Sequence, residues 1–287
     1  MDISIISVSY NTNKLIIDCL ESLQAVSGIE KEIFVIDNAS TDETVKTISV
    51  RFPEVSLIAN SENRGFGAAD NQALPSCRGR YLVFLNPDTT VAEDTLRNAV
   101  SFMDASPQIG LAGAKILNPD GSLQPSVSYK YPGEKHAHSE LTGLAGNIAC
   151  VMGAFMIAPK ALIEELHGFD EDFFLYGEDQ DLCWRIREKG LAIGYIENAR
   201  VVHWGGQSEI STPPAALFEK KLKAEYIFYK KHYLPETISR IKKAQRLKAS
   251  YRLATLKILS PFVTNKSNLL NKAECYKIAL KMAQAKD

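Results

Sequence analysis

Long apolar runs are missing from this 287-residue sequence. The longest near-uniform stretch, 148–158, is much shorter than the ~20 residues that a helix needs to cross a bilayer. The N-terminus starts with a short apolar strand pattern and has no basic segment before a hydrophobic run, so we expect no secretory signal. The composition therefore disfavours the secreted and membrane-spanning classes of protein.

Cysteines are few and show no metal-binding or redox spacing, because no C-x-x-C pair occurs. Internal repeats and low-complexity tracts are also missing. This pattern predicts reduced thiols in a cytoplasmic protein with one large domain and an appendage. The five cysteines are Cys19, Cys77, Cys150, Cys183 and Cys275.

The net charge of −1 conceals an uneven distribution. From Pro214 onward the chain has 17 Lys or Arg and 5 Asp or Glu, whereas residues 1–213 have 16 basic and 29 acidic groups. The tail also shows helical apolar spacing from Leu234 to Ile258 with basic residues between. That pattern fits a helix on an anionic membrane surface, or a solvated helix that covers its own core. We expect no nucleic-acid partner.

Strand and helix patterns alternate through the first 117 residues, which is typical of βαβ units around a mainly parallel sheet. Ser40 lies three residues before Glu43, a capping-box signature that predicts a helix to about Phe52. A further helix is expected from about Gly65 to Leu74. The expected strands are Ile3–Val8, Glu32–Ile36, Val55–Ala59, Tyr81–Leu85 and Ile109–Leu117.

The second half has weaker patterns. Residues 122–146 predict a long loop, since Ser, Pro, Gly and His dominate and periodicity is low. An apolar pattern over Asn147–Ala158 predicts a strand, and Glu178–Lys189 predicts a helix. Leu191–Ile196 and Ala199–His203 predict two short strands.

Polar residues stand at the carboxyl ends of four predicted strands, where ligands bind in open α/β sheets. Any one set alone fits an ordinary turn, because Asp and Asn are common there. Four sets at one sheet edge instead predict a ligand crevice. They are Ser9-Tyr10-Asn11, Asp37-Asn38, Asn63-Arg64-Gly65 and Asn86-Pro87-Asp88.

Each set suits one part of a nucleotide diphosphate sugar. Tyr10 can pack on a base, and Asp37 can accept a hydrogen bond from a pyrimidine N–H. Backbone N–H groups near Gly65 open a helix and can approach phosphate. Asp88 is a candidate ligand for a divalent cation, Mg or Mn, that holds the diphosphate.

A second acidic cluster, Glu178-Asp179, begins the helix predicted over 178–189. Acids at a helix start are often only capping residues. Aromatic neighbours at Phe173 and Phe174 favour a raised pKa and a general base instead. His203 ends an apolar strand, so both a core position and a ligand position remain open for it.

These segments resemble glycosyltransferase family 2 with its GT-A fold, and in particular its bacterial rhamnosyltransferase-like branch. The resemblance covers about residues 2–210, and the segment after Gly168 is the most specific. The matching segments are VSYN (8–11), VIDNASTD (35–42), NSENRGFGAADN (60–71), YLVFLNPDT (81–89), NPDGSLQ (118–124), GAFMIAP (153–159), GFDEDFFLYGEDQDLCWR (168–185) and VVHWGG (201–206).

The resemblance implies an inverting glycosyltransferase. Asp179 matches the catalytic base, and Asp88 matches the last acid of the D-x-D motif, whose first acid is replaced by Asn86. His203 matches a histidine that completes the metal site, while Glu178 and Trp204 would lie on the acceptor side. The implied donor-binding residues are Ser9, Tyr10, Asn11, Asp37, Asn38, Asn63, Arg64, Gly65, Asn86 and Asp88.

The resemblance also implies a domain plan and partners. Residues 1–213 would form the catalytic domain, with a donor half to about 117 and an acceptor half from 118, and 214–287 a basic helical extension. The donor would be dTDP-L-rhamnose or a similar nucleotide sugar. The acceptor would be a saccharide linked to polyprenyl diphosphate, used for cell-surface polysaccharide at the inner face of the cytoplasmic membrane.

Two other functions share the nucleotide-binding sheet. A sugar nucleotidyltransferase needs a Gly-rich basic loop after the first strand, and the segment Tyr10–Asn13 has no glycine. A non-catalytic nucleotide-sugar-binding protein would have no need of Asp179 as a base.

Overall fold

The computed structural model describes residues 1–206, 212–260 and 266–285, and the chain divides into two compact units. The first unit contains Met1–Tyr131, Gly143–Phe174 and Glu178–Ile210. The second contains Pro132–Thr142, Leu175–Gly177 and Ser211–Asp287. Two short segments from the middle of the chain therefore group with the C-terminal helices, and a domain boundary at residue 213 stays a prediction.

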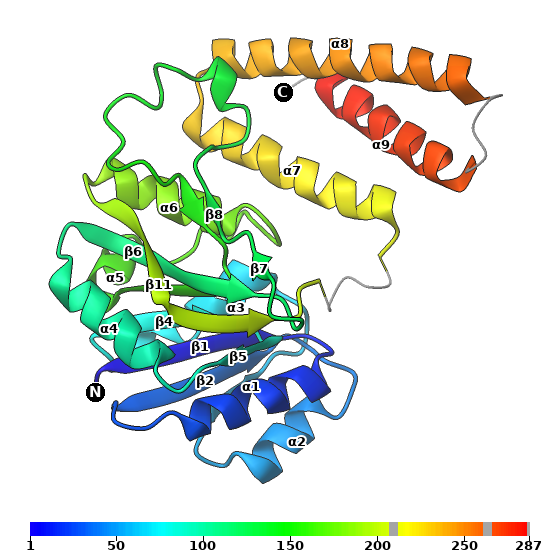
Figure 1. Ribbon diagram of the computed structural model, residues 1–287. Coiled ribbons are helices and arrows are strands. Elements are labelled where there is room, and N and C mark those ends of the chain that lie inside the picture. Colours follow the sequence, from blue (N-terminus) through cyan, green and yellow to red (C-terminus); the bar gives the residue numbers. More distant parts are fainter. Residues whose placement is uncertain (207–211, 261–265, 286–287) are drawn as a thin grey trace. The chain divides into compact units, whose positions relative to one another are not determined.

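The first unit is built on a sheet that has nine strands within the described residues (Figure 1). Four strands at one side run parallel in the order β3 (Ser56–Ala59), β2 (Lys31–Asp37), β1 (Ile3–Ser9) and β4 (Tyr81–Leu85). The antiparallel strand β10 (Phe155–Pro159) joins β4 to β6 (Ile109–Leu117). Beyond them lie β11 (Ala192–His203), parallel to β6, then antiparallel β5 (Thr89–Val91), while β7 (Leu123–Gln124) pairs with β6.

Helices cover both faces of this sheet, and each face has its own apolar cluster. One cluster joins the sheet to α1 (Asn13–Ala25), α2 (Thr44–Arg51) and α4 (Thr95–Ala105). The other joins it to α3 (Phe66–Asn71), α5 (Lys160–Glu165) and α6 (Glu178–Glu188). The predicted α/β GT-A fold with flanking helices is thus confirmed, as a mixed sheet. A small ladder of β8 (Val127–Ser128) and β9 (Cys150–Val151) lies beside it.

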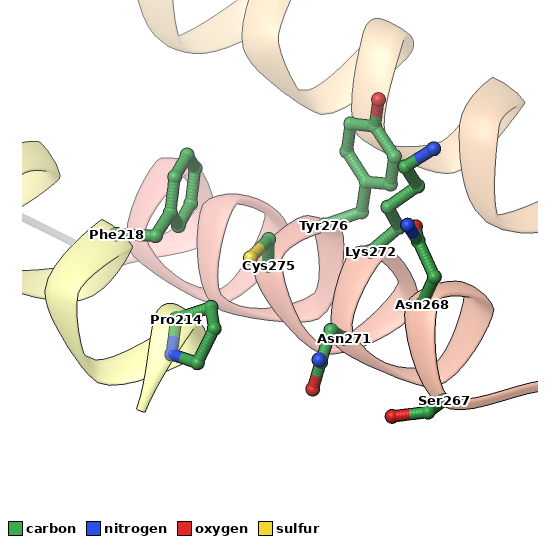
Figure 2. Close-up of a pocket in the computed structure, with 8 residues that line it drawn as sticks. All are labelled: Pro214, Phe218, Ser267, Asn268, Asn271, Lys272, Cys275 and Tyr276. Atoms are coloured by element: carbon green, nitrogen blue, oxygen red, sulfur yellow. The ribbon is translucent and has the colours of Figure 1, made fainter. Parts of the chain in front are cut away.

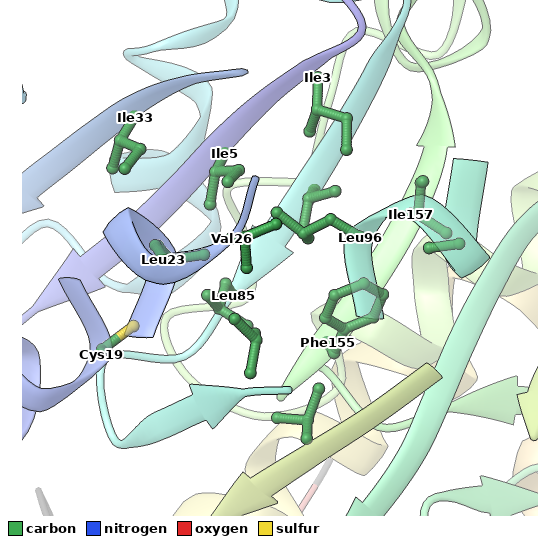
Figure 3. Close-up of a cluster of buried hydrophobic side chains, with 14 of the residues drawn as sticks. Ile3, Ile5, Cys19, Leu23, Val26, Ile33, Leu85, Leu96, Phe155 and Ile157 are labelled. Carbon is green, nitrogen blue, oxygen red and sulfur yellow. The ribbon is translucent and has the colours of Figure 1, made fainter. Parts of the chain in front are cut away.

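Alternation along the strands explains why both faces are apolar. In β1, Ile3 and Ile5 belong to one cluster, whereas Ile6 and Val8 belong to the other. Figure 3 shows Ile5 with Leu23 of α1 and Leu85 of β4. Complete burial of one such side chain contributes roughly 1.5–3 kcal/mol, so these strands fix the position of the strand ends that follow them.

Some predicted element boundaries are wrong. The expected capping box does not form, because the Ser40 hydroxyl accepts the Asn11 N–H at 2.8 Å. Helix α2 starts only at Thr44, whose N–H donates to Asp42. The helix expected from Gly65 to Leu74 ends at Asn71, and a separate 3₁₀ turn, η1, covers Leu74–Ser76.

Strand predictions in the second half also change. The single strand expected over Asn147–Ala158 is two strands, β9 and β10, separated by Met152–Ala154. The two short strands expected up to His203 are one strand, β11, with an irregularity between Ile196 and Arg200. The segment expected as a loop over 122–146 contains β7, β8 and the 3₁₀ turn η2 (Glu134–His136).

The second unit contains three long helices, α7 (Pro214–His232), α8 (Pro235–Leu259) and α9 (Lys266–Gln284). The apolar residues that the sequence placed along α8 differ in burial between its first and second halves. Ile238 and Ile241 are buried, whereas Leu247, Tyr251 and Ile258 are 65–70% exposed. Among the described residues, no helix has both the length and the apolar character needed to cross a bilayer. All five cysteines are free thiols, as predicted.

Candidate active site

The carboxyl ends of the parallel strands meet at one edge of the sheet, as the sequence predicted. Ser9 pairs in register with Asp37, and Asp37 pairs with Ala59. The Asn38 N–H donates to the Ser9 carbonyl at 2.8 Å, and the Asn60 N–H donates to the Asp37 carbonyl at 2.9 Å. The sets predicted after β1, β2 and β3 are therefore neighbours in space.

Asp37 has an acceptor atom that no described group satisfies. Its carboxylate is 1% exposed, and Oδ1 accepts the Ser40 N–H at 2.9 Å. Oδ2 is buried and makes no hydrogen bond within the described part of the chain. A buried acceptor without a donor is unfavourable, so this position is suited to an N–H from a ligand. Tyr10 is 39% exposed one residue after the end of β1.

Asn38 organises the loop that follows β3. Its amide donates to Asn63 Oδ1 at 2.9 Å and to the Gly65 carbonyl at 3.0 Å. Its oxygen accepts the Arg64 N–H at 3.0 Å and the Asn60 amide at 3.1 Å. Asn38 and Asn63 thus use their polar atoms to shape the loop, and the Arg64 side chain is exposed.

Gly65 is required by close contact with the second half of the chain. It has φ +85°, and an added Cβ would lie 2.6 Å from the Phe174 carbonyl. Its N–H donates to Asn63 Oδ1, and the Phe66 N–H donates to the Phe174 carbonyl at 2.8 Å. These two N–H groups are already bonded within the protein, so they do not offer the phosphate contact that the sequence suggested.

Ser9 and Asn11, at and just after the end of β1, also use their polar atoms in hydrogen bonds within the protein. The Ser9 side chain is fully buried, with its hydroxyl 2.8 Å from that of Thr12. Asn11 is exposed, but its side-chain oxygen accepts the Thr41 N–H at 2.8 Å. Both residues therefore hold the segment that carries Tyr10, and their polar atoms are used in doing so.

Asp88 and His203 lie together although 115 residues separate them in the sequence. Strand β5 pairs with the end of β11, so that Thr89 is opposite His203, and the Trp204 N–H donates to the Asp88 carbonyl at 3.0 Å. His203 Nε2 is 3.3 Å from Asp88 Oδ1, and each residue is 7% exposed. The Asn86 amide lies 3.5 Å from the same Nε2.

This pair fits a divalent cation that the protein only partly surrounds. No group of three or more His, Cys, Asp or Glu ligands is found among the described residues. A carboxylate oxygen is a suitable donor for Mg²⁺ or Mn²⁺, and an imidazole nitrogen suits a transition metal such as Mn²⁺ better than Mg²⁺. The remaining ligands of a cation here would come from a diphosphate and from water.

Asp179 lies at the start of α6 and is partly accessible. Its carboxylate accepts the Gln180 N–H at 2.8 Å and the Gly153 N–H. Burial nevertheless raises the pKa of Asp179 above its ordinary value. Glu178 is more deeply buried, with Oε2 unbonded within the described residues, and burial followed by the charge of Asp179 raises its pKa to about 8. Because Glu178 is the more deeply buried and has an oxygen without a donor among the described residues, we assign the proton to Glu178 and the negative charge to Asp179.

The segment between β9 and β10 links the two acidic motifs. A Cβ added to Gly153 would lie 3.9 Å from Asp179 Cβ, so the two residues are neighbours, and the Ala154 carbonyl accepts the Asn86 N–H at 3.1 Å. Adjacent residues therefore contact the start of α6 and the Asn86-Pro87-Asp88 turn. The sequence motifs for donor and base belong to one site.

Asp70 is a buried carboxyl that our sequence analysis missed. It lies in α3, is 1% exposed, and neither side-chain oxygen has a hydrogen-bond partner in the described residues. Burial is the main cause that raises its pKa well above the ordinary value, and the neighbouring carboxyl of Glu178 adds to the effect. The available signal in the sequence was a single acid directly after three small residues, Gly67, Ala68 and Ala69. The structure shows that all four residues are buried.

We expect the Asp70→Asn variant to have a flatter dependence of stability on pH. A buried acid with a raised pKa stays protonated in the folded state, so stability falls as pH rises from the unfolded value near 4 toward the folded value. Asn cannot ionise, so the drop in unfolding free energy between about pH 4.5 and 7.5 should shrink by about 1 kcal/mol or more. Urea unfolding at both pH values measures it. Exposed Asp18→Asn is the control, and equal slopes for wild type and Asp70→Asn would contradict the expectation.

A separate cavity of about 600 Å³ lies between α7 and α9 in the second unit (Figure 2). Pro214 and Phe218 of α7 face residues of α9, and Lys272 is the one charged residue in the lining. Among the described residues that line it there is no carboxylate or histidine, so we assign the chemistry to the sheet edge of the first unit. The other lining residues are Ser267, Asn268, Asn271, Cys275 and Tyr276.

This edge, with a carboxylate at a helix start and a carboxylate–histidine pair at the strand ends, fits the class of GT-A glycosyltransferases. The model of the family described as Glycosyl transferase family 2 matches residues 4–166. The chain therefore belongs to glycosyl transferase family 2, as its motifs predicted. It is a glycosyltransferase enzyme of the kind that uses nucleotide-sugar donors.

One curated relative is the N-acetylglucosaminyl-diphospho-decaprenol L-rhamnosyltransferase of Mycobacterium tuberculosis. It is 24% identical over 254 residues, which cover 78% of this chain and 82% of the relative. This relative agrees with the rhamnosyltransferase-like branch that the motifs indicated.

Two solved structures share the fold. The mannosyltransferase PcManGT from Pyrobaculum calidifontis, in complex with GDP-Man and Mn²⁺, has a TM-score of 0.64 at 19% identity, covering 98% of this chain and 86% of its own. Residues 1–349 of S. aureus TarS, in complex with UDP-GlcNAc, have a TM-score of 0.54 at 18% identity, covering 99% of this chain and 91% of theirs.

Proposed function

We propose that the protein is an inverting glycosyltransferase in which Asp179 is the general base and the edge formed by β1, β2 and β4 binds the donor. The observation that carries this proposal is the Gly153-Ala154 segment, which contacts both Asp179 and the Asn86-Pro87-Asp88 turn. A base and a donor site on neighbouring atoms of one rigid segment fit direct transfer between two bound substrates.

The donor nucleotide occupies the ends of β1 and β2 in this proposal. Asp37 Oδ2 accepts the ring N–H of a pyrimidine, which satisfies the buried acceptor, and Tyr10 packs on the base. Arg64 contacts the diphosphate, since its side chain is exposed on a loop held by Asn38 and Asn63. The roles of Ser9, Asn11 and Gly65 are to position these groups.

Asp88 and His203 hold a divalent cation in the proposal, with Asn86 beside them. A divalent cation bound there neutralises charge on the diphosphate and so stabilises it as a leaving group. The burial of both side chains keeps bulk water away and strengthens their electrostatic interaction with a bound charge.

Asp179 removes the proton of the acceptor hydroxyl as its oxygen attacks the anomeric carbon. The new bond forms on the face opposite the diphosphate, the bond from the anomeric carbon to the diphosphate oxygen breaks with its electron pair, and the proton stays on Asp179. Protonated Glu178 adds no second negative charge next to the base. Exposed Trp204, 36% accessible, lies on the acceptor side.

The proposed donor is dTDP-L-rhamnose or a related pyrimidine nucleotide sugar, and the proposed acceptor is a saccharide on polyprenyl diphosphate. The name of the Mycobacterium tuberculosis relative and the unpaired acceptor of Asp37 support this choice. A panel of nucleotide sugars, assayed for donor hydrolysis, tests it. We expect a thymidine or uridine diphosphate sugar to be preferred over its guanosine counterpart; the reverse preference would contradict the proposed base site.

The C-terminal helices bring the enzyme to the inner face of the cytoplasmic membrane in this proposal. Leu247, Tyr251, Ala254 and Ile258 recur at helical spacing and are all exposed on α8. Exposed basic residues lie on both sides of this stripe, which is the pattern of a helix lying in a lipid interface. They are Lys243, Arg246, Lys248, Arg252 and Lys257.

We expect Leu247→Glu combined with Ile258→Glu to weaken binding to anionic lipid vesicles roughly tenfold or more. Each change removes an apolar side chain worth roughly 1.5–3 kcal/mol on burial and adds a repelled negative charge. Vesicle co-sedimentation measures the effect, with Val50→Glu on α2, 74% exposed, as control. Equal binding by the double variant would favour a solvated helix face.

A further inference from the structure

The hairpin between β6 and β7 is connected to the proposed metal ligands by a chain of hydrogen bonds. His203 Nδ1 lies 2.7 Å from Gln124 Oε1, on the side of the ring away from Asp88. Gln124 is the last residue of β7, and it pairs in register with Ile116 of β6. The NPDGSLQ segment, which the proposed mechanism does not otherwise use, therefore reaches the site through this side chain.

The donor and acceptor of each hydrogen bond in this series can be assigned by starting from Asp120, at the end farthest from His203. The Asp120 carboxylate only accepts, so the Ser122 hydroxyl donates to it at 2.6 Å. The Asn118 amide then donates to Ser122 Oγ at 2.9 Å, which leaves Asn118 Oδ1 to accept the Gln124 amide at 3.0 Å. Gln124 Oε1 is thereby turned toward His203 as an acceptor.

An acceptor at this place decides which ring nitrogen of His203 carries the proton. Nδ1 must donate to Gln124, so in the neutral ring Nε2 has a lone pair. That lone pair lies 3.3 Å from Asp88 Oδ1, a second acceptor, and 3.5 Å from the Asn86 amide, which is a long and weak donor, so Nε2 and Oδ1 together offer a cation two ligand atoms. The arrangement is therefore ready for a cation before one binds.

We infer that Gln124 is a positioning residue that holds His203 in the Nδ1–H tautomer and so presents Nε2 to a divalent cation shared with Asp88. The inference rests on the metal site of the proposed function and adds to it the group that orients the ligand. Groups that orient a metal-binding histidine in this way typically change metal affinity 10- to 100-fold when removed.

The test compares two variants of the full-length protein. Gln124→Met keeps the length of the side chain but has no oxygen to accept from Nδ1. Gln124→Glu keeps an acceptor at that position and is the conservative control. Thermal unfolding of both variants checks that the hairpin still folds, and loss of folding in Gln124→Met moves the comparison to Gln124→Leu.

The first readout is the tautomer of His203, measured without metal by long-range ¹H–¹⁵N correlation in alkaline buffer, where an imidazole is neutral. His203→Gln assigns the signal among the five histidines. We expect Nδ1–H in the wild type and in Gln124→Glu, and a shift toward Nε2–H in Gln124→Met. An Nε2–H wild type would overturn the inference.

The second readout is Mn²⁺ affinity in the presence of a nucleoside diphosphate, measured by electron paramagnetic resonance. We expect Gln124→Met to bind Mn²⁺ 10- to 100-fold more weakly and Gln124→Glu to stay within about threefold of wild type. Unchanged Mn²⁺ affinity in Gln124→Met would overturn the inference. Wild-type protein that shows the Nδ1–H tautomer but no Mn²⁺ binding would instead contradict the metal site of the proposed function.

Discussion

Asp179→Asn is expected to lower kcat about 10²- to 10⁴-fold while nucleoside diphosphate affinity stays within about threefold of wild type. Asn has the same shape, and its side-chain oxygen can still accept the Gln180 N–H that Asp179 accepts at 2.8 Å. It cannot take up the proton of the acceptor hydroxyl, so the loss falls on the chemical step. Steady-state transfer kinetics together with calorimetric titration of the nucleotide separate the two quantities.

The matched control for this variant lies on the same helix. Glu188→Gln removes an exposed carboxylate at the far end of α6 and should leave both kcat and nucleotide affinity unchanged. If Asp179→Asn transferred sugar at a near-normal rate with bound donor, the base would have to be another group. Buried Glu178, with a pKa raised to about 8, is the neighbouring carboxyl that would then need the same test.

Chelation of divalent metal with EDTA is expected to lower turnover about a hundredfold or more, and added Mn²⁺ or Mg²⁺ should restore it. Asp88 and His203 are the proposed protein ligands, and the Asp88 carboxylate repels the negative charge of a diphosphate when no cation lies between them. The charge of the leaving group is therefore left without compensation when the cation is removed. Initial transfer rates over a metal titration measure the effect.

EDTA already saturated with Mg²⁺ controls for direct effects of the chelator. Asp88→Asn should raise the metal concentration needed for half-maximal rate, because the amide has lost the charge. Unchanged turnover in metal-free buffer would contradict the role assigned to Asp88 and His203.

Much of this site was predictable because parallel strands impose its geometry. Asp37, Asp88 and the residues after β1 follow buried apolar strands, so their convergence needed only the strand pattern and the rule for strand ends. Asp179 was singled out by the distinctive segment around it, and its role as the base stays a prediction. The order of strands in the second half was not predictable, because β10 enters the sheet between β4 and β6 from a distant part of the chain.

Contacts between side chains far apart in sequence were the part that the sequence did not reveal. Gln124 lies in the NPDGSLQ segment, 118–124. Its approach to His203 depends on the pairing of β7 with β6 and of β6 with β11. Asp70 follows small residues that gave no hint of Glu178 beside it. Asn38 follows a predicted strand, which suggested that it contacts a ligand. Only the structure shows that its side chain bonds Asn63 and the Arg64 N–H and so holds the loop after β3.

The anomeric configuration of the product tests the one-step mechanism, because a single displacement assisted by Asp179 must invert the reacting carbon. NMR of the product, formed from the donor that the hydrolysis panel identifies, gives this configuration from the one-bond ¹³C–¹H coupling at the anomeric carbon, which distinguishes the two anomers of rhamnose as well. We expect a configuration opposite to that of the donor. A product with the donor's configuration retained would contradict it, since retention excludes the one-step displacement in which Asp179 is the base.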